Sequence, residues 1–204
     1  MSRFTVFMIA VGGLLLASLV AVLLLKPTAE QGETSRSTGT ALVGGPFELV
    51  SHTGQTMTEA DFAGQYMLIY FGFTFCPDVC PTELQVMSAA LDILGDDGRN
   101  VTPVLISIDP ERDSVEAMAQ YVVNFHPRLV GLTGTPEQVA AAASAYRVYY
   151  QKVADDSSAA AYTMDHSSVV YLMGPDGAFI KHFGPGTSPE KMAKTIAAAI
   201  ADAS

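Results

Sequence analysis

The chain has 204 residues, of which 49% are apolar and only 16% charged, and its formal net charge is −10. This composition excludes an intrinsically disordered chain, because disordered segments are poor in apolar residues. A surface of this sign repels phosphate groups, which argues against nucleic acid as a partner.

The N-terminus carries a long apolar stretch. Residues 4–25 contain no charged side chain, and Arg3 and Lys26 flank them. A helix needs about 20 apolar residues to cross a bilayer, whereas a cleaved signal peptide has an apolar stretch of only about 7–15. We therefore predict an uncleaved transmembrane anchor over 1–25, with a removed signal peptide as the alternative. Both send the rest of the chain across the membrane.

The composition changes after the apolar stretch. Residues 26–45 are rich in Ser, Thr and Gly and show no apolar period, which is typical of a flexible linker. Residues 46–204 are long enough to bury a substantial core. We predict that they form one domain.

Strand and helix patterns alternate within this domain. A short hairpin is expected over 46–57, and Thr58 is expected to cap a helix start. The continuous apolar runs 66–73 and 101–108 predict central strands buried on both faces. Helices are expected over 81–94, 114–125, 136–147 and 188–203, and strands over 129–132, 148–152, 168–173 and 178–183. This order predicts an α/β sandwich with a central mixed sheet.

The chain has only two cysteines, Cys76 and Cys80, in the segment CPDVCP between a buried strand and a helix. Each precedes a proline, which disfavours the α conformation for the residue before it. We therefore expect Cys80 to cap the helix and Pro81 to occupy its first position. The N–H groups and the dipole of a helix N-terminus stabilise thiolates, so both thiol pKa values should fall.

Several roles are open to this cysteine pair. Two buried structural cysteines, or a structural disulfide in an exported protein, need no chemistry. Two thiolates also suit Cu(I), zinc or a redox-active disulfide. A metal site needs a further ligand, and His166 in the polar loop 162–168 is a candidate. The places of the other histidines need no metal to explain them. We expect His52 in a solvent-facing turn, His126 at a helix end and His182 in a late strand.

Six segments occur in an order that resembles the SCO/SenC family: GPFEL at 45–49, FGFTFCPDVCPTEL at 71–84, LISIDPERD at 105–113, YRVYYQK at 146–152, MDHSS at 164–168 and YLMGPDG at 171–177. The resemblance covers essentially all of 45–204. It implies a thioredoxin-like fold and a membrane-tethered copper protein. It also implies that Cys76 and Cys80 are the two thiolate ligands and that His166 is the imidazole ligand of one copper ion.

The resemblance further implies a metallochaperone that delivers copper to the dinuclear copper centre of cytochrome c oxidase. The implied partners are the copper-bearing oxidase subunit, other copper chaperones and thioredoxin-like reductases. The chain lacks an Arg- and Ser-rich transit peptide, which favours the bacterial inner membrane, with the domain in the periplasm. Neighbouring side chains with candidate supporting roles are Asp78, Asp109, Met164, Asp165 and Phe75.

A thiol–disulfide oxidoreductase is the alternative function. In that role Cys76 and Cys80 would be a redox-active pair that keeps the acceptor's copper-ligand cysteines reduced. Three residues separate these cysteines, rather than the two of a general thioredoxin. A peroxidase is a third possibility, but the sequence contains no separate Thr-x-x-Cys arrangement.

Overall fold

The computed structural model describes residues 43–154 and 161–203. The predicted anchor over 1–25 lies outside these residues, as does most of the predicted linker over 26–45. In the part of the chain that is described, no helix combines the length and apolar character needed to cross a membrane.

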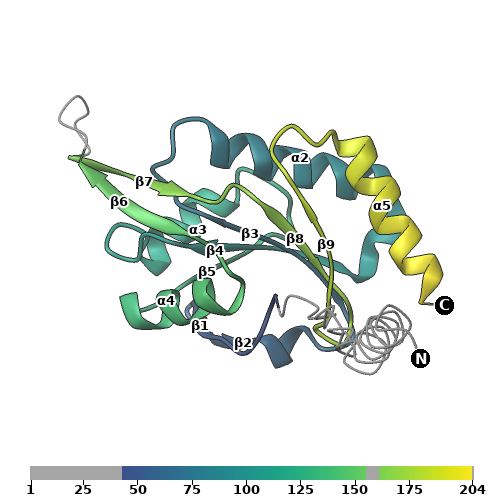
Figure 1. The fold of residues 1–204 in the computed structure, drawn as a ribbon, viewed down its shortest axis with the longest axis horizontal. Helices are drawn as coiled ribbons and strands as arrows, with labels where there is room; N and C mark the ends of the chain where they lie inside the picture. The colour runs from purple at the N-terminus through teal and green to yellow at the C-terminus, as the bar shows by residue number, and fades with distance from the viewer. Residues whose placement is uncertain (1–42, 155–160, 204) are drawn as a thin grey trace, which may run out of the picture. The chain divides into compact units, whose positions relative to one another are not determined.

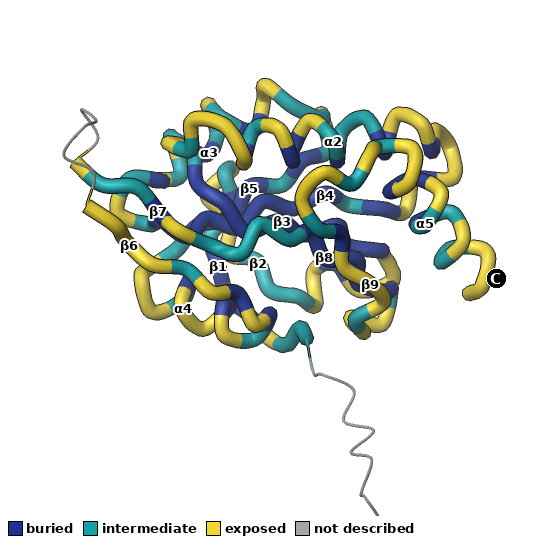
Figure 2. Tube along the Cα trace, turned by 45° about the horizontal axis from the view of Figure 1, so that its top comes forward, coloured by how far each residue is buried: buried dark blue, intermediate teal, exposed yellow. Residues whose placement is uncertain are grey.

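The central element is a mixed sheet with the strand order β2-β1-β5-β4-β3-β8-β9 (Figure 1). Strand β3 (Tyr66–Gly72) is parallel to β4 (Val101–Ser107) and antiparallel to β8 (Val170–Met173). Every residue of β3 is buried (Figure 2), as its continuous apolar run predicted. The outer strands are β1 (Glu48–Ser51), β2 (Thr56–Thr58), β5 (Val130–Thr133) and β9 (Phe179–Phe183).

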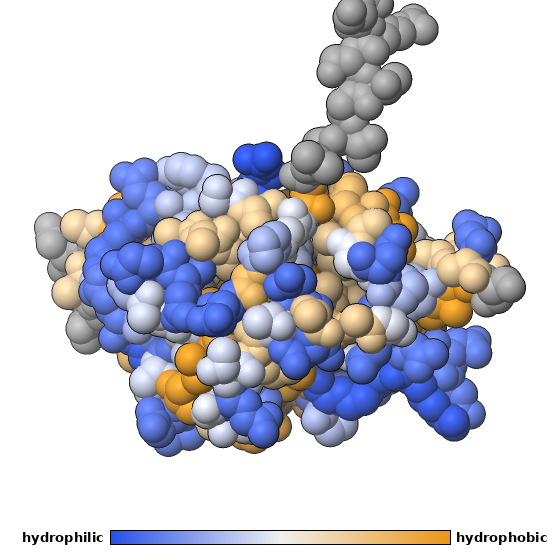
Figure 3. All heavy atoms as spheres, turned by 90° about the horizontal axis from the view of Figure 1, so that it is seen from below, coloured by the Kyte–Doolittle hydropathy of each residue, from blue (hydrophilic) through white to orange (hydrophobic). Residues whose placement is uncertain are grey.

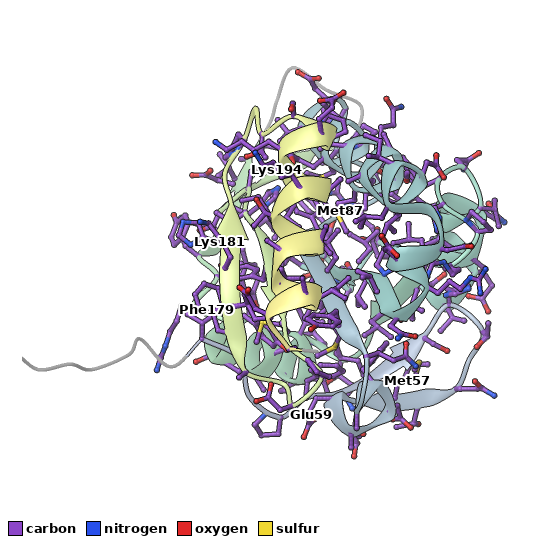
Figure 4. The ribbon with its side chains drawn as sticks, turned by 90° about the vertical axis from the view of Figure 1, so that its right-hand side faces the viewer. Met57, Glu59, Met87, Phe179, Lys181 and Lys194 are labelled. Carbon is purple, nitrogen blue, oxygen red and sulfur yellow. The ribbon has the colours of Figure 1, made fainter. Side chains whose placement is uncertain are left out.

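Helices cover both faces of this sheet. Figures 1 and 2 show α2, α3 and α5 on one side and α4 on the other. Figure 4 looks onto α5, which carries Lys194 and runs beside α2, which carries Met87. The helices are α2 (Val79–Leu94), α3 (Val115–Val122), α4 (Pro136–Ala145) and α5 (Pro189–Asp202), with 3-10 turns η1 (Glu59–Phe62) and η2 (Gly95–Asn100).

Aromatic rings fill the core between β3, α4 and β8. The ring of Phe71 lies 5.5 Å from that of Tyr146 and 6.3 Å from that of Tyr171, centroid to centroid. On the face seen from below in Figure 3, hydrophilic residues surround scattered apolar ones. Most of the large apolar side chains in the described residues are buried around the sheet, as the apolar runs of the sequence predicted.

The predicted caps Thr58, Ser114 and Ser188 are confirmed, Thr58 at the 3-10 turn η1, whereas the predicted cap of α2 is wrong. The side chains of Ser114 and Ser188 accept hydrogen bonds at the starts of α3 and α5. Helix α2 begins earlier than predicted, so its N-cap is Asp78 and Cys80 is already helical. Pro81 is tolerated within the first turn, because the first four N–H groups of a helix have no intrahelical partner.

A second, two-stranded sheet joins β6 (Tyr150–Ala154) and β7 (Tyr162–His166). Figure 1 shows this hairpin reaching beyond the main sheet. The prediction of a polar loop over 162–168 was wrong, because β7 extends through His166. The side chain of Met164 is buried while that of Asp165 is exposed, and this alternation is the signal of a strand.

Candidate metal centre

The two cysteines lie where β3 leads into α2. Cys76 is partly exposed in the connecting loop, and Cys80 is fully buried in the first turn of the helix. The Cys80 backbone N–H donates a hydrogen bond to Cys76 Sγ over 3.3 Å. Both side chains are free thiols. The junction therefore holds both sulfurs at one end of the sheet.

His166 reaches this end of the sheet through the strand order. Strands β3 and β8 are antiparallel neighbours, with Tyr70 opposite Val170. The end of β3 and the approach to β8 therefore lie side by side. This arrangement places His166 Nε2 3.7 Å from Cys80 Sγ, although the two residues are 86 positions apart.

The orientation of the imidazole is fixed by its other nitrogen. His166 Nδ1 lies 3.2 Å from the carbonyl oxygen of Ser167. Because a carbonyl oxygen can only accept a hydrogen bond, Nδ1 carries the proton. Nε2 therefore keeps its lone pair, which faces Cys80. A ring nitrogen needs such a free lone pair to bind a metal ion.

Aromatic side chains enclose the imidazole. The rings of Tyr70 and Phe73 each pack edge-on against His166 at a centroid distance of 6.0 Å. Burial lowers the pKa of His166. The ring is therefore neutral at neutral pH, which is the form that can bind a metal ion.

The two thiols differ in acidity. A hydrogen bond from Cys80 lowers the pKa of Cys76 to about 5, against the effect of its partial burial. The pKa of Cys80 is raised, first by its hydrogen bond to Cys76 and then by burial. The prediction that the helix N-terminus lowers both values was thus wrong for Cys80. Cys76 is the thiolate of the pair.

Two residues that support the site were not singled out from the sequence. The Tyr70 hydroxyl donates a hydrogen bond to Cys80 Sγ over 3.7 Å. A Cβ atom at Gly72 would lie 2.8 Å from the ring of Tyr70 and 3.1 Å from Cys80 Sγ. A glycine at the end of a buried strand is itself a signal of such a close approach.

The separation of Cys80 and His166 fits two ligands of one ion. In zinc sites, for example, the bonds are about 2.3 Å to sulfur and about 2.0 Å to nitrogen, which places a sulfur and a nitrogen ligand of the same ion about 3.5–3.8 Å apart. Across residues 43–154 and 161–203, no three or more His, Cys, Asp and Glu side chains are placed so that together they could hold a metal ion. The structure thus brings Cys80 and His166 to ligand distance, whereas Cys76 contacts Cys80 through the hydrogen bond that its Sγ accepts from the Cys80 backbone N–H.

The candidate supporting residues divide into two groups. The carboxylates of Asp78 and Asp165 are exposed. Burial lowers the pKa of His166, and the charge of Asp165 acts against this larger effect. Met164 is buried and lines a cavity beneath the hairpin, together with Asp109 and Lys152. Phe75 is 55% exposed, so it covers the site only in part.

Contacts outside the site explain the other three histidines. His52 is partly exposed in the turn after β1, and its Nδ1 accepts a hydrogen bond from the Gly131 N–H. His126 Nδ1 accepts from the Arg128 N–H. His182 lies opposite Tyr171 in the sheet, as a cross-strand residue.

A mixed α/β sandwich with a dithiol loop at a strand–helix junction and an imidazole facing it defines a thioredoxin-like protein with a thiol-based site. The SCO1/SenC family model matches residues 35–201, and the chain belongs to this family.

Similar proteins support this assignment. The human protein SCO1 homolog, mitochondrial, is 47% identical over 190 residues, which cover 92% of this chain and 63% of that protein. The chain therefore spans less than two thirds of the length of this relative.

Two solved structures share the fold. The structure of Arabidopsis thaliana ScoI with copper bound is 43% identical, with a TM-score of 0.75, and covers 78% of this chain and 99% of that one. Bradyrhizobium japonicum ScoI with copper bound is 42% identical, with a TM-score of 0.69, and covers 76% and 97%. The predicted thioredoxin-like fold with a central mixed sheet is confirmed.

Proposed function

We propose that this chain is a copper metallochaperone that binds one copper ion through Cys76, Cys80 and His166. The observation that carries the proposal is the 3.7 Å separation between Cys80 Sγ and His166 Nε2. Two thiolates and a neutral imidazole suit Cu(I), and mixed nitrogen and sulfur donors also accept Cu(II). Relatives from Arabidopsis and Bradyrhizobium were solved with copper bound, which supports the same cargo here.

The different exposure of the two cysteines suits transfer of the cargo. Cys76 is partly exposed and ionises readily, whereas Cys80 is buried. A cysteine or histidine of an acceptor protein can therefore approach the site from the side of Cys76. Copper is passed on by ligand exchange that begins there.

The acceptor that we propose is the copper-bearing subunit of cytochrome c oxidase. Other copper chaperones and thioredoxin-like reductases are further proposed partners, on the strength of family membership. We also propose that residues 1–25 anchor the chain in a bacterial inner membrane and that the linker over 26–45 presents the domain over 46–204 to the periplasm. Tethering donor and acceptor to one membrane raises their effective concentration.

Copper titration of the full-length chain tests the proposal. Under anaerobic conditions the protein should bind one equivalent of Cu(I), and Cys76→Ser or Cys80→Ser should abolish tight binding. His166→Ala should weaken Cu(II) binding and change its absorption spectrum. His182→Ala is the matched control, because this histidine is exposed on β9. A wild-type chain that binds no stoichiometric copper would refute the proposal.

The acidity of Cys76 favours a second candidate function, thiol–disulfide exchange. The Cys76 thiolate attacks an acceptor disulfide, forms a mixed disulfide and releases one acceptor thiolate. The Cys80 thiol then loses its proton to the departing sulfur and attacks Cys76 Sγ. This step frees the second acceptor sulfur, so that two electrons pass to the acceptor and Cys76 and Cys80 form a disulfide.

The two functions differ in their need for the imidazole. A reductase that acts only through its thiols should reduce a model peptide disulfide at an unchanged rate in His166→Ala. A copper carrier should lose Cu(II) affinity in the same variant. Measuring both quantities on one preparation assigns His166 to one role or the other.

A further inference from the structure

We propose that Arg112 is a positioning residue that holds the strand of His166 against the cysteine loop. The inference rests on the proposed copper-binding function, since it concerns how His166 is kept beside Cys80. Arg112 lies in the connection between β4 and α3, and its side chain is largely buried, with 14% exposed. It contacts both segments that carry the candidate ligands.

The first contact is with the β6–β7 hairpin. The guanidinium carbon of Arg112 lies 3.7 Å from the ring centroid of Tyr162, the first residue of β7. The Nη1 atom of the same guanidinium donates a hydrogen bond to the Tyr162 carbonyl oxygen over 3.0 Å. Arg112 thus binds both the side chain and the backbone at the start of β7.

The second contact is with the cysteine loop. The guanidinium carbon of Arg112 lies 4.8 Å from the ring centroid of Phe75, the residue directly before Cys76. It also lies 5.9 Å from the ring of Phe73, which packs edge-on against His166. One planar cation therefore bridges the aromatic residues of the cysteine loop and those of the hairpin.

A buried carboxylate fixes the guanidinium in this place. Asp109 is only 2% exposed, forms an ion pair with Arg112 Nε and accepts a hydrogen bond from the Tyr162 hydroxyl over 2.9 Å. The ring of Tyr162 also lies 4.1 Å from Lys152 Nζ, which pairs with Glu111. The start of β7 is therefore held through the ring, the hydroxyl and the carbonyl oxygen of Tyr162.

The geometry of β7 carries this restraint to His166. Tyr162, Met164 and His166 lie on the same face, because side chains alternate along a strand. Tyr162 and His166 are the two ends of the strand, about 13 Å apart at the usual rise per residue. The His166 end is held by the hydrogen bond from the Ser167 N–H to the Tyr149 carbonyl oxygen. Without the contact at Tyr162, the β6–β7 hairpin is held less firmly against the cysteine loop, so that β7 can shift and carry the imidazole away from Cys80.

Two variants of the full-length chain test the proposal. Arg112→Lys keeps the charge but removes the planar surface and the forked donors. Tyr162→Leu removes the stacked ring while the buried pair of Asp109 and Arg112 stays in place, which protects the test if Arg112→Lys does not fold. Arg99→Lys is the matched control, because Arg99 pairs with Asp96 on the exposed surface.

The first measurement needs no copper. Amide hydrogen exchange in β7 of the copper-free chain should become at least about tenfold faster in both variants and stay unchanged in the control. The second measurement is Cu(II) affinity, which should fall about tenfold to a hundredfold, the range for residues that orient metal ligands. Introducing Arg112→Lys into His166→Ala should cause no further loss of Cu(II) affinity, because Arg112 acts through His166.

The outcomes separate this inference from the proposed function. Unchanged exchange in β7 in both variants would overturn the positioning role, and so would a further loss of Cu(II) affinity in the His166→Ala background. A wild-type chain that binds no copper would refute the proposed function alone, because the exchange measurement on the copper-free chain would still show whether Arg112 holds β7.

Discussion

Tyr70, near the end of β3, faces Cys80, in the first turn of α2, and the tyrosine hydroxyl donates a hydrogen bond to Cys80 Sγ over 3.7 Å. Both side chains are fully buried. The same Tyr70 ring packs edge-on against His166. One tyrosine therefore contacts both residues that the structure brings to ligand distance.

Removal of this hydroxyl should weaken the site. In Tyr70→Phe the Cys80 sulfur loses a donor that favours its thiolate, so we expect copper affinity to fall about tenfold, the lower end for such supporting residues. Competitive titration against a chelator measures the change. Tyr66→Phe is the matched control, because its hydroxyl donates to the Ala199 carbonyl oxygen, remote from the site. Equal losses in the two variants would contradict a specific role for Tyr70.

Gly72 should be intolerant of any side chain. In Gly72→Ala the new Cβ would lie 2.8 Å from the Tyr70 ring and 3.1 Å from Cys80 Sγ. Such overpacking costs about 1–3 kcal/mol of the free energy of unfolding, which chemical denaturation measures. Gly184→Ala is the control, because nothing lies within 4 Å of its added Cβ. If Gly72→Ala were as stable as the control, Tyr70 and Cys80 could move aside without loss of stability, and the prediction would be wrong.

Alkylation of the copper-free, reduced chain should distinguish the two thiols. Because the pKa of Cys76 is lowered to about 5, its rate with iodoacetamide should rise as the pH passes 5 and level off well below neutrality. Cys80 should stay unmodified, since it is buried and its pKa is raised. Mass spectrometry of the digested product reports each cysteine separately.

Two controls sharpen the alkylation experiment. In Cys80→Ala the midpoint for Cys76 should move to higher pH, because the hydrogen bond that lowers its pKa is lost. In urea both cysteines should react with a midpoint near the ordinary value of about 8.5. A Cys76 midpoint near 8.5 in the folded wild type would contradict the asymmetry.

Asp113 should be a major contributor to stability near the cysteine loop. Its buried carboxylate accepts hydrogen bonds from the hydroxyls of Thr74 and Ser107, each over 2.6 Å. Asp113→Ala leaves these donors without their acceptor, at an expected cost of about 2–4 kcal/mol of the free energy of unfolding. Urea denaturation measures the loss. Asp96→Ala, which removes an exposed ion pair, should cost less than about 1 kcal/mol.

The pH dependence of the same residue has a definite sign. Burial raises the pKa of Asp113 above its ordinary value. A carboxyl group with a raised pKa in the folded state binds its proton more tightly there than in the unfolded chain. It therefore favours folding most at pH values below its unfolded pKa, and this contribution is lost as the pH rises through the folded pKa. The stability difference between wild type and Asp113→Asn should follow this trend, and a difference independent of pH would contradict it.

Local patterns in the sequence determined most of the elements. The apolar run that became β3 has no polar residue that could face solvent, so burial on both faces was the only stable outcome. Ser114 and Ser188 cap their helices because each side chain accepts a hydrogen bond from the backbone N–H three residues later, which is a local contact. The start of α2 was misplaced because a proline within the first turn is compatible with more than one helix start.

The cysteine pair was also visible in the sequence, as was the histidine motif, but their meeting was not. The approach of Cys80 to His166 depends on β3 and β8 being antiparallel neighbours, which brings together residues 86 positions apart. The opposite pKa shifts of Cys76 and Cys80 likewise depend on which sulfur is buried and which donates to the other. Burial, and hydrogen bonds between residues far apart in the sequence, depend on how the elements pack, so only the tertiary structure decided them.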